Sequence, residues 1–481
     1  MLNTDQITIT TNPLLIVQQR FSLLNMSAEI RIIDNHEVSD VLAGKKNDIS
    51  LYRRPEGQLL IKRYLETLSV ASKPKEVIEQ FLVDPKTHTY DEIAFSPLKT
   101  PSTTLNYWRG PTVTPTPGDW SVIRNFLYEV ICNEDLTLYH YLLRYIAHML
   151  QNPEEKPSIA IVLLSGSGCG KGTFFQLLSA IWSKSALEVS DINQVIGTFN
   201  AALEKNYLVM MDEALFKGDK ASMERLKSMI SEPTIHVEQK YQPSRTIESY
   251  HRFFAASNSE HFANIPIDDR RFVFIKVSNR KQQDLIYFDL VHKAINDPTT
   301  IAAFVYDLFA MDLINFKVRQ RPITHEHLNQ RIQSLDGFER YWLEVLETGK
   351  IRTKPLGIYS SCETEWEEPI FISTQYIIDS YSHYDKTAGR YEPLQTQKIA
   401  ATLQKICPSA KSIRTKNSSN KQERGYQLPS ITLARGEFES AIKTRINWNN
   451  KSPESIERDY EEEPDPDLLY EAMREIASET I

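Results

Sequence analysis

Apolar positions follow a helical period between about residues 119 and 150 and then change to short continuous runs. Between 119 and 131 they recur at helical spacing behind Asp119, a candidate cap, and a second such pattern covers 138–150. From 158 the sequence SIAIVLL is uninterrupted, which is typical of a strand buried on both faces of a parallel sheet. A glycine-rich turn and another helical pattern follow it. This order of elements predicts an α/β fold.

Two later apolar runs, 206–214 and 252–260, end in polar residues. Ligands of open α/β sheets bind at the carboxyl ends of the strands, so these polar ends are expected to converge on one crevice. Ahead of the sheet, residues 1–95 indicate a small α+β unit, and the Pro/Thr-rich stretch 97–119 is expected to be a linker. Helical patterns return at 325–348.

Composition adds an acidic tail to this picture. The chain has 481 residues and a net charge of −8, and residues 451–481 alone carry eleven acids and three bases, or 3 − 11 = −8. The rest of the chain therefore sums to zero, and its charge does not argue against a nucleic-acid partner. The tail is expected to be largely disordered.

Cysteine spacing and hydropathy exclude several classes of protein. The four cysteines lie far apart without C-x-x-C spacing, which argues against a zinc site or a disulfide framework and fits a reducing cytoplasm. No apolar run approaches the ~18 residues of a membrane helix, and the amino terminus does not resemble an export signal. We expect a cytoplasmic protein without a membrane partner.

The turn at 166–173, GSGCGKGT, resembles a phosphate-binding loop with two departures from the common form. Ser165 stands where that form has its first glycine, and Gly172 follows Lys171 where Ser or Thr is usual. The glycines would let backbone N–H groups approach phosphate oxygens, and the lysine would contact the β- and γ-phosphates. The alternative is a strand-to-helix turn without a ligand. The candidate nucleotide-binding residues are Gly166, Ser167, Gly168, Cys169, Gly170, Lys171, Gly172 and Thr173.

Acidic and polar residues at two strand ends extend this candidate site. Asp212 would hold Mg²⁺ through its water shell, and Glu213 would orient the attacking water. Asn258, at the end of FFAASN, would touch both the γ-phosphate and that water. Taken singly, each of these is better explained by an ordinary strand end or turn. The argument rests on their order and spacing.

Arg270 and Arg271, in DDRRFVF, directly precede an apolar strand. One of them would reach the γ-phosphate of a neighbouring subunit, as arginine fingers do. The alternative is a strand start held by Asp–Arg salt bridges. Without a hydroxyl after Lys171, we expect Thr173 to contact the α-phosphate and Mg²⁺ to be held by the nucleotide, water and the region of Asp212.

Two basic segments are candidate DNA contacts. TIHVEQ and RTIESYH predict a hairpin, with Lys240, Tyr241 and Arg245 near its tip offering charge for phosphates and a ring for stacking. Between 355 and 450, Ser373 would cap one helix, 395–407 predicts a second, and SIRTKNSSNKQERGYQL predicts two strands, the layout of a winged helix. Its basic side chains, for which contact with DNA and a solvated loop are both open, include Lys405, Lys411, Arg414, Lys416, Lys421 and Arg424.

Together, GSGCGKGT, YLVMMDEA, ISEPTIHVEQK, RFFAASNSE and DDRRFVF resemble the superfamily 3 helicases, in particular the helicase part of phage, plasmid and satellite primase-helicase proteins. The resemblance covers roughly residues 80–345. It implies an AAA+-like P-loop core in a hexameric ring, with ATP and Mg²⁺ between subunits and channel hairpins that grip single-stranded DNA. By position, Lys171 is the loop lysine, Asp212 and Glu213 the acidic pair, Asn258 the sensor, Lys240 the channel lysine, and Arg271, better than Arg270, the finger.

The expected organisation is therefore an α/β chain of six segments: an N-terminal α+β domain (1–100), a linker and helical collar (101–155), the ATPase core (156–320), a helical connector (321–354), a winged-helix-like DNA-binding domain (355–450) and the acidic tail (451–481). We expect a replicative DNA helicase of a mobile genetic element in a bacterial host, working on single-stranded or forked DNA. No complete primase precedes the collar, so a separate primase or host replication protein is an expected partner. The alternatives are an ATP-assembled origin-binding switch and, from GKGT alone, a small-molecule nucleotide kinase.

Overall fold

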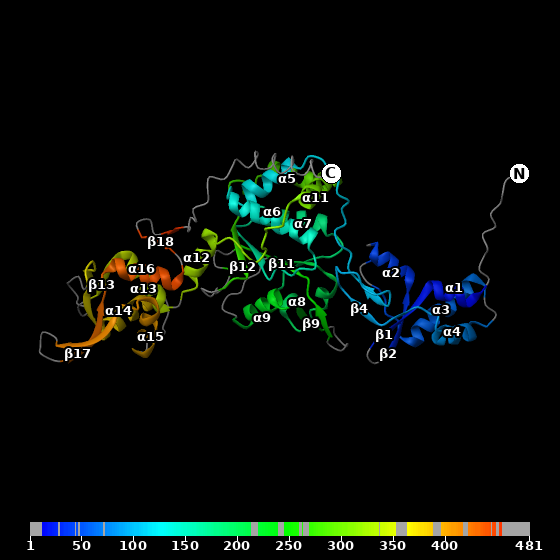
Figure 1. Cartoon of the computed structure of the whole chain (residues 1–481), viewed down its shortest axis with the longest axis horizontal. Helices are drawn as coiled ribbons and strands as arrows, with labels where there is room; N and C mark the ends of the chain where they lie inside the picture. The colour runs from blue at the N-terminus through cyan, green and yellow to red at the C-terminus, as the bar shows by residue number, and fades with distance from the viewer. Residues whose placement is uncertain are drawn as a thin grey trace.

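The computed structural model describes three units, which lie side by side along the longest axis of Figure 1. The N-terminal unit is blue, the central unit runs from cyan to green, and the C-terminal unit is yellow to orange. The described residues are 12–26, 29–43, 45–46, 49–70, 73–212, 220–238, 245–258, 262, 269–335, 337–352, 363–387, 396–416, 422–443, 445–448 and 452–454. The predictions for the acidic tail beyond 454 lie outside these residues.

A five-stranded parallel sheet forms the centre of the molecule, in the order β12-β6-β11-β8-β7. The expected buried strand is confirmed as β6, and all five of its side chains are buried. The runs ending in polar residues are confirmed as β8 and β11. The strands are β6 (Ala160–Leu164), β7 (Ala186–Val189), β8 (Leu208–Met211), β11 (Arg252–Ser257) and β12 (Phe272–Lys276).

Helices cover both faces of this sheet, as Figure 1 shows. Successive side chains of a strand point to opposite faces, so Ile161 and Leu163 enter one core and Val162 and Leu164 the other. On the first face lie α5 (Ser121–Asn125), the π-helix η1 (Phe126–Ile131), α6 (Leu136–Gln151), α7 (Lys171–Ile181), α10 (Leu285–Asn296) and α11 (Pro298–Ala310). On the second face lie α8 (Asn193–Ile196), the 3-10 helix η2 (Ala201–Lys205) and α9 (Lys220–Ser231).

The two helical patterns ahead of the sheet are confirmed, but they do not stand apart from it. Side chains of η1 and α6 share one core with β6, β11 and β12. Tyr145 Oη donates to the Ile159 carbonyl at 3.2 Å, directly before β6. The buried face of α6 therefore belongs to the same folded unit as the sheet.

The stretch expected to be a linker is packed against the central unit. Thr112 N donates to Ile181 O at 2.8 Å, and Thr116 N donates to Ala302 O at 3.3 Å. Tyr107 and Trp120 are 2% and 3% exposed. Proline and threonine predicted the extended backbone correctly, while the aromatic side chains, through their burial, attach it to the neighbouring helices.

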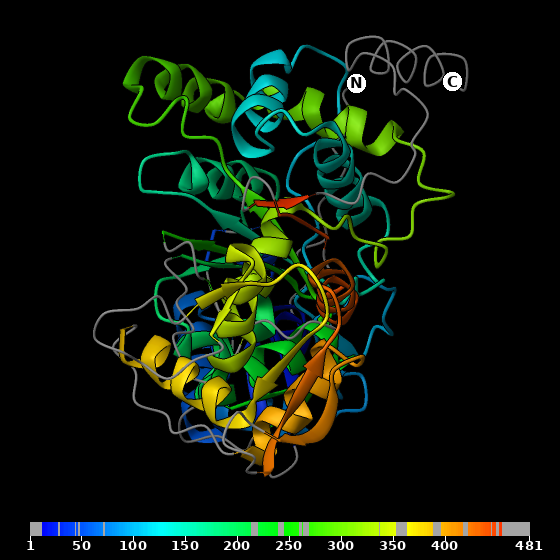
Figure 2. The ribbon, with the colours of Figure 1, turned by 90° about the vertical axis from the view of Figure 1, so that its left-hand side faces the viewer.

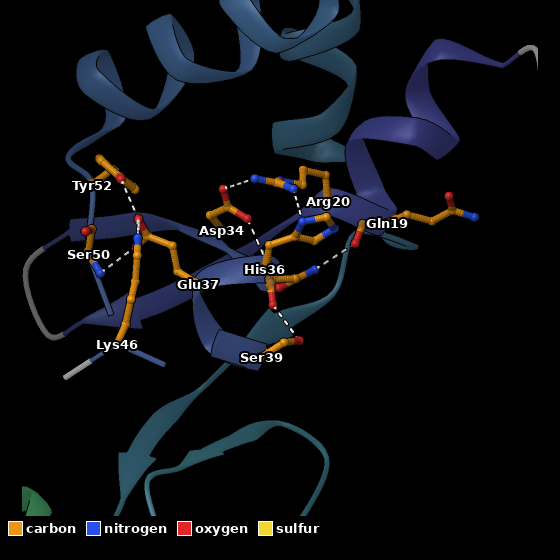
Figure 3. Close-up of polar contacts among 10 residues, drawn as sticks. Gln19, Arg20, Asp34, His36, Glu37, Ser39, Lys46, Ser50 and Tyr52 are labelled. Atoms are coloured by element: carbon orange, nitrogen blue, oxygen red, sulfur yellow. Dashed lines mark hydrogen bonds and ion pairs between the residues drawn. The ribbon is translucent and has the colours of Figure 1, made fainter. Parts of the chain in front are cut away.

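The N-terminal unit is a small α+β fold, as expected. Its sheet has the order β2-β1-β3, and Arg20, the last residue of α1, forms an ion pair at 2.8 Å with Asp34, which ends β2 and precedes α2 (Figure 3). Asp34 also caps α2, since its carboxylate accepts from His36 N at 2.9 Å. The elements are α1 (Pro13–Arg20), β1 (Phe21–Met26), β2 (Glu29–Asp34), α2 (Asn35–Leu42), α3 (Arg54–Leu68), α4 (Pro74–Val83) and β3 (Thr89–Tyr90). A parallel pair, β4 (Glu92–Ala94) and β5 (Thr104–Asn106), follows.

The C-terminal unit has its own core and an antiparallel sheet in the order β15-β17-β16. The two helices and two strands expected there are confirmed, and Ser373 Oγ accepts from Gln375 N at 3.2 Å at the start of α14. Figure 2 views the molecule from this unit's side. The elements are α13 (Gly337–Thr348), β13 (Lys350–Arg352), β14 (Glu363–Glu365), β15 (Ile370–Ser373), α14 (Thr374–Thr387), α15 (Thr396–Ile406), β16 (Lys411–Lys416), β17 (Gln422–Leu428), α16 (Ile431–Ile442), β18 (Arg445–Asn447) and β19 (Ser452–Glu454).

One helix, α12 (His325–Gln333), joins the central and C-terminal units. Thr324, its N-cap, donates from Oγ1 to the Phe274 carbonyl of β12 at 2.7 Å. On its other side Arg331 donates to the Lys443 carbonyl, at the end of α16, at 3.2 Å. Among the described residues no helix is long and apolar enough to cross a membrane.

A buried arginine and a buried histidine hold the start of β11 in place. Arg252 is 0% exposed, donates to the carbonyls of Asn152, Pro153 and Glu155, and lies 5.0 Å from the ring centre of Tyr207. Next to it, His251 is 1% exposed. Its Nε2 lies 2.9 Å from the Leu203 carbonyl and its Nδ1 2.9 Å from Ser249 Oγ, so the neutral ring donates from Nε2 and accepts at Nδ1. Burial lowers the pKa of His251 to about 4.

This histidine is expected to make folding sensitive to acid. The unfolded ring takes up a proton below its ordinary pKa of about 6.5, while the folded ring stays neutral down to about 4. Its contribution is complete above pH 6.5 and falls by about 2 kcal/mol between pH 6.5 and pH 5. Urea unfolding of the wild type and of His251→Gln at both pH values should show that much less loss in the variant. His236→Gln, at an exposed position of β9, is the control, and an equal loss in all three proteins would contradict the assignment.

Candidate functional site

The glycine-rich loop lies between the carboxyl end of β6 and the start of α7. Gly168 and Gly170 have positive φ angles of 74° and 102°. A Cβ atom at Gly170 would lie 2.9 Å from Phe288 and 3.1 Å from Phe126, so this position excludes a side chain both by its backbone conformation and by its neighbours. At Gly172 a Cβ atom would meet nothing within 4 Å. The departure from the common pattern at 172 is therefore not imposed by crowding.

Lys171 is folded into this loop and is 7% exposed. Its Nζ lies 2.9 Å from both the carbonyl and the hydroxyl of Ser165, and 2.7 Å from the Gly166 carbonyl. It also donates to Asn258 Oδ1, just after β11, at 2.9 Å. The structure thus brings together two of the predicted site residues, 87 positions apart in the chain. A phosphate oxygen in the loop could replace these neutral acceptors and pair with the buried ammonium.

A segment that the sequence did not single out covers the outer side of the loop. Gln282 Nε2 donates to Ser167 O at 2.9 Å, and Gln283 N donates to Gly168 O at 3.1 Å. Phe288, on α10, packs against Gly170. Because the loop carbonyls are bonded from outside, the loop conformation depends on the link between β12 and α10. Polar residues after a strand gave no signal of this role, since they are common there.

The carboxylate side of the site is described as far as Asp212. Its backbone N–H donates to the Val189 carbonyl at 2.8 Å, so it continues β8 by one residue along β7. The sequence did not predict that Glu188, on β7, belongs to this part of the site. Its pKa is raised, mainly by burial and to a smaller extent by the negative charge of Asp212. Glu188 pairs with Met210, two positions before Asp212, so the two acidic residues lie on the same face of the sheet. Glu213 lies outside the described residues.

Arg270 and Arg271 lie at the opposite end of the sheet from the loop. The Arg271 carbonyl accepts from Ala160 N, the first residue of β6, at 2.8 Å. The loop begins after Leu164, and at about 3.3 Å per residue the length of β6 separates the two by roughly 13 Å. Arg271 therefore does not belong to the same site as Lys171 of its own chain. Its guanidinium contacts Ser231 and Asp269, whereas Arg270 is exposed.

The predicted hairpin is confirmed as β9 (Thr234–Val237) paired antiparallel with β10 (Arg245–Glu248). Lys240 and Tyr241 lie outside the described residues. Arg245 forms an ion pair with Glu204 of η2, whose side chain is only 6% exposed. This pair holds the first residue of β10, and a role for Arg245 in DNA binding stays a prediction.

The basic strands of the C-terminal unit carry an unusual pair. Arg414 of β16 and Arg424 of β17 lie directly opposite each other, and both are exposed. Like charges at opposite positions repel, which favours an anion between them. Lys416 is also exposed, on the same face as Arg414, while Lys405 forms an ion pair with Glu339 at 2.8 Å. Lys421 lies outside the described residues.

Within the described part of the chain, no group of three or more His, Cys, Asp and Glu residues forms a metal site. Magnesium needs few protein ligands when a nucleotide supplies the others. Asp212, at the carboxyl end of β8, and the Thr173 hydroxyl, on the first turn of α7, are of the right chemistry for that role.

Comparisons with known proteins support a link to phage replication proteins. Residues 163–271 match a family described as "Family of unknown function (DUF5906)", a range that runs from β6 and the loop to Arg271. A DNA primase-polymerase of Nitratiruptor phage NrS-1 is 24% identical over 189 residues, which are 37% of this chain and 26% of that protein. The chain thus aligns with about a quarter of that relative's length.

Solved structures of the C-terminal region of NrS-1 have the same fold. An apo structure aligns with a TM-score of 0.59 at 16% identity and covers 86% of this chain and 99% of its own. A second apo form gives a TM-score of 0.59 at 15% identity over 88% and 100% of the two chains. The likeness extends over all three units, and it concerns the fold.

Proposed function

We propose that this chain is an ATP-driven motor of phage DNA replication that moves on single-stranded DNA. The observation that carries the proposal is the contact between Lys171 and Asn258 at 2.9 Å, at the mouth of a glycine-rich loop between β6 and α7. The similarity to a phage DNA primase-polymerase supports a role in replication. A P-loop core of the AAA+ type, as in superfamily 3 helicases, fits the parallel sheet and this loop.

In this proposal each side chain has a definite task. Lys171 exchanges its carbonyl partners for β- and γ-phosphate oxygens, and the loop N–H groups bind the remaining oxygens. Asn258 holds the γ-phosphate and the attacking water, which Glu213 orients. Magnesium, which the nucleotide, water and Asp212 would hold, would neutralise phosphate charge, and Thr173 would contact the α-phosphate.

The position of Arg271 supports a site shared between two copies. It lies at the far end of β6 from the loop of its own chain, so it can contact a γ-phosphate only in a neighbour. A closed ring, hexameric by the resemblance, provides such a neighbour to every subunit. The hairpin tips with Lys240 and Tyr241 would then face the DNA, and forked DNA and a separate primase would be the expected partners in the host cell.

A second candidate is a switch that assembles on an origin when ATP binds, without processive unwinding. The opposed Arg414 and Arg424 favour it, because they give the C-terminal unit an anion contact away from the hairpins. Both candidates require ATP binding at the loop. They differ in whether DNA drives hydrolysis.

ATP hydrolysis by the full chain, with and without single-stranded DNA, tests the proposal. The motor predicts stimulation by DNA of about tenfold or more, because DNA in the channel speeds the cycle. It also predicts that Lys240→Ala loses unwinding and keeps ATP binding. Hydrolysis indifferent to DNA, together with little effect of Lys240→Ala, would favour the switch. Absence of both hydrolysis and nucleotide binding would overturn both candidates.

A further inference from the structure

Asp269 is a buried carboxylate surrounded by cations at the amino end of β12. Its side chain is 1% exposed and lies 3.6 Å from Arg271 Nη1 and 4.0 Å from Lys227 Nζ. Oδ1 accepts from Arg271 N at 2.8 Å, while Oδ2 has no hydrogen-bond donor among the described residues. A buried charge of this kind persists only where neighbouring charges compensate it.

The same carboxylate sets the orientation of the Arg271 side chain. Arg271 Nε donates at 2.6 Å to the hydroxyl of Ser231, which is the last residue of α9. Nη1 of the same guanidinium faces Asp269. A guanidinium is planar, so two anchored nitrogens define the plane and the direction in which the third points. The Arg271 side chain is 33% exposed, and its exposed part is available to another molecule.

Asp269 is in turn held from the side of α12. Arg321 donates to the Asp269 carbonyl at 2.7 Å, and its Nη2 lies 3.2 Å from His327 Nε2. Burial, with the charges of Arg321 and Arg331, lowers the pKa of His327 to about 2, so the ring is neutral and can accept from Arg321. Arg331, on α12, contacts the end of α16. Helix α12 therefore links Asp269 and its neighbours to the C-terminal unit.

We propose that Asp269 is the positioning residue of Arg271, and that Arg321 on the α12 side fixes Asp269 in turn. The proposal rests on the proposed function, in which Arg271 acts on the nucleotide of a neighbouring copy. It adds a second set of residues, remote from the loop, on which the rate of hydrolysis depends. Asp269 touches neither the nucleotide nor the water and acts only through Arg271.

The test combines ATP hydrolysis with thermal unfolding in a double-mutant cycle. Asp269→Asn is expected to lower kcat by about tenfold or more with KM and nucleotide binding unchanged, because binding precedes any use of Arg271. In the Arg271→Ala background the same change should have little further effect on kcat. A merely structural role would instead lower kcat by the same factor in both backgrounds, and that result would overturn the proposal.

A control and a milder variant complete the experiment. Glu224→Gln removes the exposed partner of the same Lys227 and should leave kcat unchanged. If Asp269→Asn fails to fold, Ser231→Ala removes only the Nε acceptor and should lower kcat by a smaller factor, again only when Arg271 is present. Full activity of Ser231→Ala and Asp269→Asn, in a protein whose hydrolysis needs Arg271, would overturn the inference and leave the proposed function intact.

The unfolding temperatures decide the inference if the protein hydrolyses no ATP. The proposed function would then have failed, while coupling between Asp269 and Arg271 can still be measured. Asp269→Asn should lower the Tm less in the Arg271→Ala background than in the wild type, since the lost contact is shared. Equal shifts in both backgrounds would mean that the two side chains are not coupled.

Discussion

Replacing Lys171 with alanine is expected to lower ATP hydrolysis by about 100-fold or more and to weaken nucleotide binding. The ammonium is the buried cation of the loop, 7% exposed, and bound phosphate would exchange neutral carbonyls for a charge-assisted pair with it. Titration with a fluorescent ATP analogue measures binding, and a phosphate-release assay measures turnover. The side chain donates to acceptors of the loop and to Asn258, all of them at the site itself, so the fold should survive.

Lys293→Ala is the matched control, because Lys293 lies on α10, which packs beside the loop, and it is exposed and pairs with Asp289 at the surface. It should keep both binding and turnover. Wild-type nucleotide binding by Lys171→Ala would contradict the assignment of the loop and direct attention to another part of the chain.

The second large effect is expected at Gly170 and is absent at Gly172. Gly170→Ala forces a Cβ atom to 2.9 Å from Phe288 at φ 102°, which should destabilise the fold by about 3 kcal/mol and prevent nucleotide binding. Gly172→Ala meets nothing within 4 Å and replaces a helical glycine, so stability should be kept or rise by up to about 1 kcal/mol. Urea unfolding and nucleotide titration measure the two effects on the same samples.

Gly172→Ser extends this comparison to the metal. The added Cβ atom meets nothing within 4 Å, so at most the dependence of hydrolysis on Mg²⁺ should change. Equal damage from alanine at 172 and at 170 would show that position 172 needs glycine for a reason other than the space around it.

The sequence predicted the elements of the central unit well, because buried parallel strands and amphipathic helices carry strong local patterns. SIAIVLL became β6, and the segments around KYQPS became β9 and β10. The loop lysine and the polar strand ends could likewise be recognised from residue type and order. Their convergence is confirmed where it is described, in the contact between Lys171 and Asn258.

Other features carry no local signal. The Pro/Thr-rich stretch looked like a linker, because the helices that receive Tyr107 and Trp120 come later in the chain. Arg245 looked like a hairpin-tip cation, and only the fold brings Glu204 to it. Glu188 stands in an ordinary strand, and its proximity to Asp212 depends on the pairing of β7 with β8.

By itself, therefore, the sequence determined the α/β class, the glycine-rich turn with its lysine, and which strand ends are polar. Periodicity and backbone freedom are properties of neighbouring residues, so a single chain displays them. The tertiary structure alone decided that Arg271 lies at the far end of the sheet from Lys171, that Ser231 holds its guanidinium and that Arg321 holds Asp269. Strand register and packing between distant segments create those contacts, and no local pattern encodes them.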